Sequence, residues 1–159
     1  MVQTLADLMI AIIGCGNLNR SDDGVGIEVI RGLEPSDQVK LLDAGTDGMA
    51  VMFGARGCTT LIVVDSCRTG SEPGSIFEVP GAELAKVHEA QLNLHAFRWD
   101  NALYAGKKIF REQFPGDVVV LLIEGRSFDL NLGLCAEVAA ARDKVRARIK
   151  ALIAERLST

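Results

Sequence analysis

Continuous apolar runs alternate along the chain with runs in which an apolar residue recurs every three or four positions. The first kind predicts strands buried in a sheet, and the second predicts helices with one buried face. The predicted strands are residues 8–13, 39–42, 59–64, 75–79 and 118–123. The predicted helices are residues 23–33, 49–55, 93–113 and 133–156, with a weakly helical polar stretch at 81–91. This alternation predicts an α/β fold of three αβα layers, a mostly parallel sheet with helices on both faces.

The composition suits one compact domain over residues 1–159, because 48% of the residues are apolar and 24% are charged. The net charge of −4 and the lack of a basic block argue against a nucleic-acid partner. The apolar runs are shorter than the roughly 20 residues that a membrane span needs, and the first ten residues do not resemble a secretory signal. We therefore expect a single cytoplasmic domain without a membrane segment.

The cysteines are scattered and form no C-x-x-C pair. They are Cys15, Cys58, Cys67 and Cys135. This pattern favours buried reduced thiols over a zinc or disulfide framework. Cys15, in the turn after the first strand, is the thiol to consider as a nucleophile. The carboxylates of Asp22 and Asp23 are expected to raise its pKa and make it a poor one.

The turn after the first strand, residues 14–26, contains several glycines and two acidic residues. It is similar to the dinucleotide-binding pattern G-x-G-x-x-G, but Asn19 stands where the third glycine would be. Ser21, Asp22 and Asp23 are suited to capping the following helix, and the charge of the two aspartates disfavours a pyrophosphate at its N-terminus. The turn therefore favours a cation site over a nucleotide site.

Acidic residues also follow the ends of the predicted strands, where the loops of a parallel sheet converge. Asp23, Asp43 and Asp65 occupy such positions. His95 falls near the start of the predicted long helix, where the helix dipole favours the neutral imidazole. Two carboxylates and one imidazole from separate loops can form an open site for a divalent transition metal such as zinc or nickel. On spacing alone, however, an aspartate at a strand end is as often a helix cap, and His95 can equally pack against Trp99.

Three sequence blocks resemble the hydrogenase maturation proteases. Residues 14–26, G-C-G-N-L-N-R-S-D-D-G-V-G, match the family's G-x-G-N-x-L followed by D-[DE]-G-x-G. Residues 43–49, D-A-G-T-D-G-M, match D-x-G-T-x-G-M, and residues 63–66, V-V-D-S, match an apolar strand that ends in V-D-[AS]. The resemblance spans nearly the whole chain and implies a twisted five-stranded sheet between helices. We expect Gly45 and Gly48 to be needed for turn geometry, because a turn from a strand into a helix often requires positive φ.

The resemblance also implies a set of metal ligands: the second acid of the first block, the aspartate after the third strand and a downstream histidine. Here these are Asp23, Asp65 and His95. His95 is preferred to His88, which lies in the polar stretch without a helix start. The sequence around His95, N-L-H-A-F-R-W-D over residues 93–100, departs from the family's usual S-x-H-x-x-x-L. Residues 124–126, E-G-R, also replace the usual acid or amide followed by proline.

Proteases of this family remove a short C-terminal extension from the large-subunit precursor of a nickel-iron hydrogenase after nickel insertion. The chain has no G-x-S-x-G elbow and no H-E-x-x-H helix, and its two histidines leave few bases for a serine or cysteine triad. A metal-directed mechanism remains, and together with it the resemblance implies an endopeptidase that uses nickel supplied by its substrate and no organic cofactor. Two alternatives are a non-proteolytic, nickel-dependent binding or chaperone module for the large subunit and a metallohydrolase of small molecules.

Overall fold

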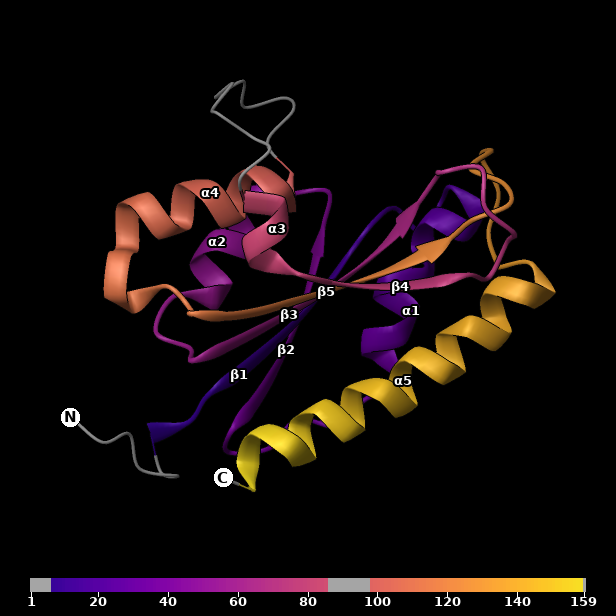
Figure 1. The fold of residues 1–159 in the computed structure, drawn as a ribbon. Helices are drawn as coiled ribbons and strands as arrows, with labels where there is room; N and C mark the ends of the chain where they lie inside the picture. Colours follow the sequence, from indigo (N-terminus) through magenta and orange to yellow (C-terminus); the bar gives the residue numbers. More distant parts are fainter. Residues whose placement is uncertain (1–6, 86–97, 159) are drawn as a thin grey trace.

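The computed structural model describes residues 7–85 and 98–158 (Figure 1). In this part of the chain, five strands form one sheet in the order β2-β1-β3-β5-β4. The strands are β1 (Ile10–Cys15), β2 (Val39–Gly45), β3 (Thr60–Cys67), β4 (Ile76–Pro80) and β5 (Asp117–Glu124). β1 is parallel to β2 and β3, and β3 is parallel to β5, whereas β4 is antiparallel to β5. The mostly parallel sheet predicted from the sequence is therefore confirmed.

Helices cover both faces of this sheet (Figure 1). They are α1 (Val25–Arg31), α2 (Gly48–Ala55), α3 (Gly81–Ala85), α4 (Trp99–Phe110) and α5 (Ala136–Leu157), with short 3-10 turns η2 (Ser21–Gly24) and η4 (Arg111–Gln113). Successive side chains of a strand point to opposite faces. Ile10 and Ile12 of β1 pack in one core with α1 and α5, while Ala11 and Ile13 pack in another with α2 and α4. These two cores confirm the three αβα layers.

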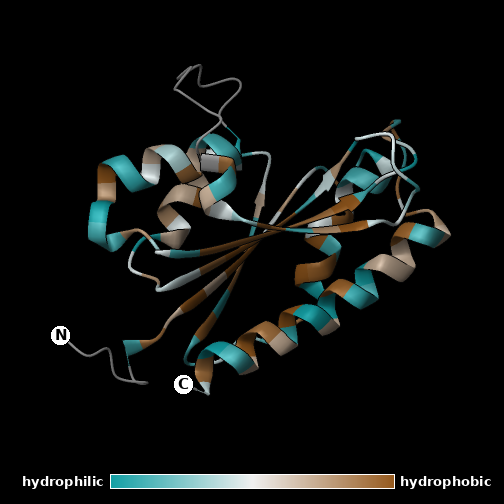
Figure 2. Cartoon of the chain, viewed as in Figure 1, coloured by the Kyte–Doolittle hydropathy of each residue, from teal (hydrophilic) through white to brown (hydrophobic). Residues whose placement is uncertain are grey.

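The last helix, α5, has one apolar face along its length, and Figure 2 shows polar and apolar segments alternating on it. Its buried residues recur at helical spacing and include Val138, Val145 and Ile149. This periodicity is the signal that predicted the helix. In residues 7–85 and 98–158, no helix is long and apolar enough to cross a membrane.

Several helix boundaries differ from the predicted ones. The first helix begins as the 3-10 turn η2 and ends at Arg31 rather than at residue 33. The last helix begins at Ala136, because Gly133 has a φ of 98° and Cys135 is extended, with a ψ of 163°, and neither conformation fits a right-handed helix. α4 ends at Phe110, where the positive φ of Arg111 interrupts the helix. The predicted start of that helix, at residues 93–97, lies outside the described residues.

Two glycines let α1 lie directly against the sheet. A Cβ atom on Gly26 would be 2.4 Å from the carbonyl oxygen of Val64 in β3, and one on Gly14 would be 2.5 Å from the carbonyl oxygen of Gly26. Such distances are far below van der Waals contact, so only glycine permits this approach. The close packing brings the segment before α1, which carries Asp23, to the carboxyl ends of β1 and β3.

Candidate active site

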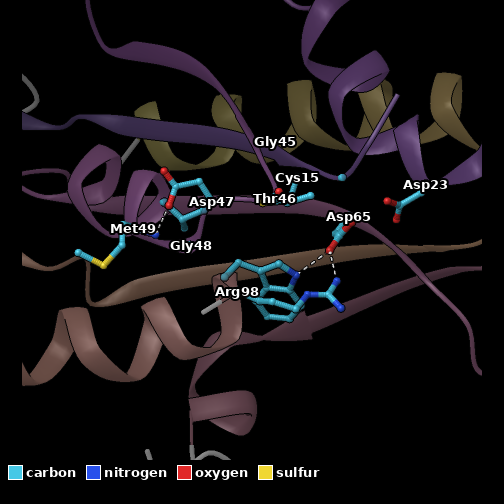
Figure 3. Close-up of a pocket in the computed structure, with 12 residues that line it drawn as sticks. Cys15, Asp23, Gly45, Thr46, Asp47, Gly48, Met49, Asp65 and Arg98 are labelled. Atoms are coloured by element: carbon cyan, nitrogen blue, oxygen red, sulfur yellow. Dashed lines mark hydrogen bonds and ion pairs between the residues drawn. The ribbon is translucent and has the colours of Figure 1, made fainter. Parts of the chain in front are cut away.

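A cavity of about 560 Å³ lies at the carboxyl ends of the parallel strands (Figure 3). Its walls come from the end of β1, the turn before η2, the β2–α2 loop, β3 and the start of α4. The polar side chains among its lining residues are those of Cys15, Asp23, Thr46, Asp47, Asp65, Arg98 and Trp99. This position agrees with the expectation that ligands bind where the strand ends of an open parallel sheet converge.

Asp65, near the end of β3, is the most deeply buried acid of the cavity, with a side chain only 2% exposed. Its Oδ1 atom accepts a hydrogen bond from the Ser66 amide at 2.7 Å, and Oδ2 accepts bonds from Trp99 Nε1 at 2.8 Å and Arg98 Nη2 at 3.2 Å. Burial raises the pKa of Asp65 despite these donors, and the nearby charge of Asp23 raises it further. An additional positive charge in the cavity would therefore stabilise the carboxylate.

Asp23 reaches the same cavity from η2 and is tied to β3 through Ser66. Asp23 Oδ1 accepts a 2.6 Å hydrogen bond from the Ser66 hydroxyl, and Oδ2 accepts the Asn17 amide at 3.0 Å. Ser66 thus fixes both acids, one through its hydroxyl and one through its amide. Ser66 was not predicted to be a site residue, although its place directly after Asp65 in the V-D-S block was the available signal.

Gly16 makes room for the two acids to lie together. Its φ is 130°, and a Cβ atom there would lie 1.9 Å from the carbonyl oxygen of Asp23 and 3.6 Å from Asp65 Oδ1. Any side chain at position 16 would therefore push η2 away from β3. The second glycine of the first block, Gly16, is therefore needed for this close approach.

Asp22 does not line the cavity, and no side chain of Ser21, Asp22 or Asp23 caps η2 or α1, so the expectation that these residues cap the first helix is wrong. Asp22 is 1% exposed and accepts hydrogen bonds from the backbone amides of Arg126, Ser127 and Cys135 at 2.8, 3.0 and 2.8 Å. Burial by itself raises the pKa of Asp22, but these amide donors outweigh it and the net pKa is lowered. Asp22 joins η2 to the loop between β5 and α5.

The β2–α2 loop lines the cavity through backbone turns. Asp43 is exposed, accepts the Gly45 amide at 3.0 Å and is not part of the cavity wall. Asp47 caps α2 by accepting the Met49 amide at 2.9 Å. Gly45 has the expected positive φ, 56°, whereas Gly48 is the first residue of α2 and has no positive φ. The geometric requirement was therefore predicted correctly for Gly45 and wrongly for Gly48.

Cys15 lies at the end of β1 and is 5% exposed. Burial is the largest cause that raises the pKa of its thiol, and Asp65 is the acid that raises it most, with a smaller effect of Asp23. The predicted direction is confirmed, but burial and Asp65 are the main causes instead of Asp22 and Asp23. The thiol stays protonated at neutral pH and is a poor nucleophile. All four cysteines are free, so the disulfide alternative is wrong.

The two histidines, His88 and His95, lie outside the described residues. Among the residues that are described, no group of three or more His, Cys, Asp and Glu side chains is placed to hold a metal ion. Asp23 and Asp65 nevertheless direct carboxylate groups into one cavity, and such a pair suits a divalent cation when further ligands join it. Metal ligation by Asp23, Asp65 and His95 stays a prediction.

The start of α4 adds two site residues that were not predicted to be part of the site. Arg98 and Trp99 both line the cavity and both donate to Asp65. The Arg98 amide donates to Asn101 Oδ1 at 3.1 Å, which helps to fix the start of α4. The available signal was their position three and four residues after the candidate histidine, at helical spacing.

The fold and the cavity define a class: α/β proteins with a mostly parallel sheet and an acidic pocket at the carboxyl ends of its strands. The family model for hydrogenase maturation proteases matches residues 26–152, a range that includes Asp65 and begins just after Asp23. This chain belongs to the hydrogenase maturation protease family. The resemblance seen in the three sequence blocks is thereby confirmed.

Individual relatives agree with this assignment. A Methanocaldococcus jannaschii protein named as a hydrogenase maturation protease is 34% identical over 143 residues, which cover 85% of this chain and 90% of that protein. The coenzyme F420 hydrogenase subunit delta of Methanothermobacter thermautotrophicus is 36% identical over 89 residues, 50% of this chain and 56% of that protein. The hydrogenase maturating endopeptidase HybD from E. coli has the same fold, with a TM-score of 0.79 at 21% identity and 94% coverage of both chains.

Proposed function

We propose that this protein is an endopeptidase that removes the C-terminal extension from the large-subunit precursor of a nickel-iron hydrogenase after nickel has been inserted. Membership of the hydrogenase maturation protease family supports the reaction class. The observation that carries the proposal is the pair of acids, Asp23 and Asp65, that Ser66 holds together in one cavity. Such a pair is suited to holding a cation beside a bound peptide.

The substrate is proposed to bring the metal. Asp23 and Asp65 lie on separate elements, and with His95 they would supply three ligands and leave coordination positions open. A nickel ion that precursor cysteines already hold needs only one or two more ligands to bridge the two proteins. A nickel-free precursor offers the same peptide without that contact, so the bridge also provides selectivity.

The chemistry follows from this placement. The substrate's nickel would polarise the scissile carbonyl or activate a water molecule. The contribution of this chain is to orient that ion through two carboxylates whose positions are fixed by Asn17 and Ser66. Cys15 forms no covalent intermediate in this proposal, because its thiol is buried and stays protonated.

The test is to incubate the purified protein with nickel-loaded and with nickel-free precursor and to follow the intact mass of each. We expect the nickel-loaded precursor to lose its C-terminal extension and the nickel-free precursor to stay intact. Elemental analysis of the isolated protein should find less than one metal ion per chain. Efficient cleavage of the nickel-free precursor, or one tightly held zinc whose removal abolishes cleavage, would instead establish an ordinary metalloprotease.

One observation favours a second candidate, a binding module that recognises the nickel-loaded large subunit without cutting it. A relative that matches half of this chain is named as a subunit of a hydrogenase and not as a protease. A binding module would copurify with the nickel-loaded precursor and leave its mass unchanged. The same incubation therefore separates the two candidates, because only the endopeptidase shortens the precursor.

A further inference from the structure

Asp65 already holds a positive group in the free protein. The Arg98 guanidinium donates to Asp65 Oδ2 at 3.2 Å, and the Trp99 indole donates to the same oxygen at 2.8 Å (Figure 3). A metal ion bound through this oxygen would need the lone pairs that these donors use. It would also meet the Arg98 charge at close range. Arg98 and a metal ion therefore compete for Asp65.

The two oxygens of Asp65 differ in their exchangeability. Oδ1 accepts a hydrogen bond from the backbone amide of Ser66 at 2.7 Å. Because Ser66 is the next residue in the same strand, this hydrogen bond has little freedom to open. Oδ2 is held by two side chains that both line the cavity. Asp23, by contrast, accepts its described hydrogen bonds from neutral donors, Asn17 and Ser66. Competition with a bound cation is thus concentrated at Oδ2 of Asp65.

Exposure indicates which partner moves. The Arg98 side chain is 65% exposed, whereas that of Asp65 is 2% exposed. An arginine that is mostly in water gives up one ion pair at small cost, because water replaces its partner. Asp65 lies in β3, which is hydrogen-bonded to β1 and β5 on its two sides, so it stays in place. Exchange at Oδ2 therefore requires Arg98 to swing out of the cavity and the Trp99 indole to give up its hydrogen bond to Asp65.

We propose that Arg98 is a specificity-determining residue whose guanidinium, together with the Trp99 indole, occupies Asp65 Oδ2 until a metal ion presented in the cavity displaces it. The identity of that ion as substrate nickel rests on the proposed function. A free ion has only its own coordination bonds to offset the loss of the ion pair. An ion carried by a docked protein also gains from the contacts of that protein. The cost of displacing Arg98 therefore weakens the binding of free ions more than that of protein-bound ions.

The experiment uses Zn²⁺ alone as the probe, because Zn²⁺ accepts carboxylate and imidazole ligands and has no redox chemistry. The dissociation constant of Zn²⁺ is measured by calorimetry for the full-length wild type and for Arg98→Gln and Arg98→Lys. We expect Arg98→Gln, which removes the charge, to bind Zn²⁺ about fivefold more tightly, and Arg98→Lys, which keeps it, to stay near wild type. Arg148→Gln is the matched control, because it removes an arginine–carboxylate pair between Arg148 on α5 and Glu78 on β4, and neither residue lines the cavity.

Trp99 supplies an independent readout, since it is the only tryptophan of the chain. Its emission should change as Zn²⁺ binds, because the indole N–H loses its carboxylate acceptor. In Asp65→Asn the emission response should disappear, and adding Arg98→Gln to that variant should no longer tighten Zn²⁺ binding. Thermal unfolding of each variant establishes that it is folded.

Three results would overturn the proposal. The first is a Zn²⁺ affinity of Arg98→Gln that is equal to or weaker than that of the wild type, including no binding by either. The second is an Arg98→Lys variant that binds as tightly as Arg98→Gln, and the third is Zn²⁺ binding that leaves Trp99 emission unchanged. None of these readouts involves cleavage. If the Zn²⁺ results are as expected but no precursor is shortened, the proposed protease function fails while the role of Arg98 stands.

Discussion

Asp22 and Asp65 are both buried aspartates, yet their surroundings move their pKa values in opposite directions. Asp22 is 1% exposed and its pKa is lowered, because three backbone amides outweigh the effect of burial. Asp65 is 2% exposed and its pKa is raised, because burial outweighs one amide and two side-chain donors. Burial of an acid therefore does not by itself mark a functional residue.

The difference lies in the kind of partner. Backbone amides are fixed by the fold, so the contacts of Asp22 persist as long as η2 and the loop before α5 are folded. Two of the three donors of Asp65 are side chains, and one of them is largely in water. A carboxylate whose hydrogen-bond donors are mobile side chains is available to a ligand. A carboxylate whose hydrogen bonds all come from backbone amides instead connects two segments of the fold.

The largest effect is expected at the cavity. Asp65→Asn and Asp23→Asn preserve shape but remove the charge that a cation needs, and His95→Ala removes the predicted third ligand. Each should lower the cleavage of nickel-loaded precursor about 100-fold or more. Intact mass over a time course measures this. Asp65→Asn should unfold no more easily than the wild type, since its charge is unfavourable where it is buried.

His88→Ala is the control for these variants and should cleave at the wild-type rate. Normal trimming by Asp23→Asn or His95→Ala would remove that residue from the site. Normal trimming by Asp65→Asn would contradict the conclusion that Asp65 is a functional acid and Asp22 a structural one.

Asp22→Asn should have the next largest effect, on stability. An amide side chain loses the charge and turns an N–H group toward amides that need an acceptor. The free energy of unfolding should fall by about 2 kcal/mol, as measured by urea denaturation. Cleavage per folded molecule should change much less than in Asp65→Asn. A variant as stable as the wild type would show that the hydrogen bonds between Asp22 and the β5–α5 loop are not needed for stability.

The pH dependence of stability should separate the two acids. Asp65 has a raised pKa in the folded state, so its contribution is lost as pH rises from its ordinary value of 3.8 through that raised value. Asp22 has a lowered pKa, so its contribution is present above 3.8 and is lost as pH falls through the folded value. Urea denaturation at a series of pH values gives the free energy of unfolding as a function of pH. Asp65→Asn should make this free energy depend less on pH above 3.8, and Asp22→Asn should make it depend less on pH below 3.8.

The smallest effect is expected in the β2–α2 loop. Gly45 has a φ of 56° and nothing within 4 Å of an added Cβ, so Gly45→Ala adds only backbone strain of about 1 kcal/mol. Because Gly45 lines the cavity, cleavage should also slow several-fold. Gly57→Ala is the matched control: Gly57 has a φ of 82°, equally open surroundings and no place in the cavity wall. Equal cleavage rates in the two variants would show that the loop does not position the substrate.

Much of the fold was predictable because hydrophobic periodicity reports directly on burial. The five strands and the face of α5 followed from that signal. Helix ends were less predictable, since backbone angles such as the positive φ of Gly133 and Arg111 decide them. Apolar spacing contains no information on those angles.

The site was predictable only where strand ends determine it. Asp23 and Asp65 were placed together because parallel strands end at the same edge. The opposite directions of the adjacent Asp22 and Asp23 depend on the 3-10 turn η2, which the helix pattern did not reveal. The contact of Arg98 with Asp65 depends on how α4 packs against the sheet, and short-range sequence patterns do not describe such packing.

The cavity also depends on the lack of a side chain at Gly16. A Cβ at position 16 would lie 1.9 Å from the carbonyl oxygen of Asp23, so every amino acid other than glycine displaces the turn that carries both Asp22 and Asp23. A single mutational step at this codon would therefore disable the site without changing any charged or nucleophilic residue. In a related sequence with the same turn, we expect a residue other than glycine at this position to mark a copy that has lost the cavity.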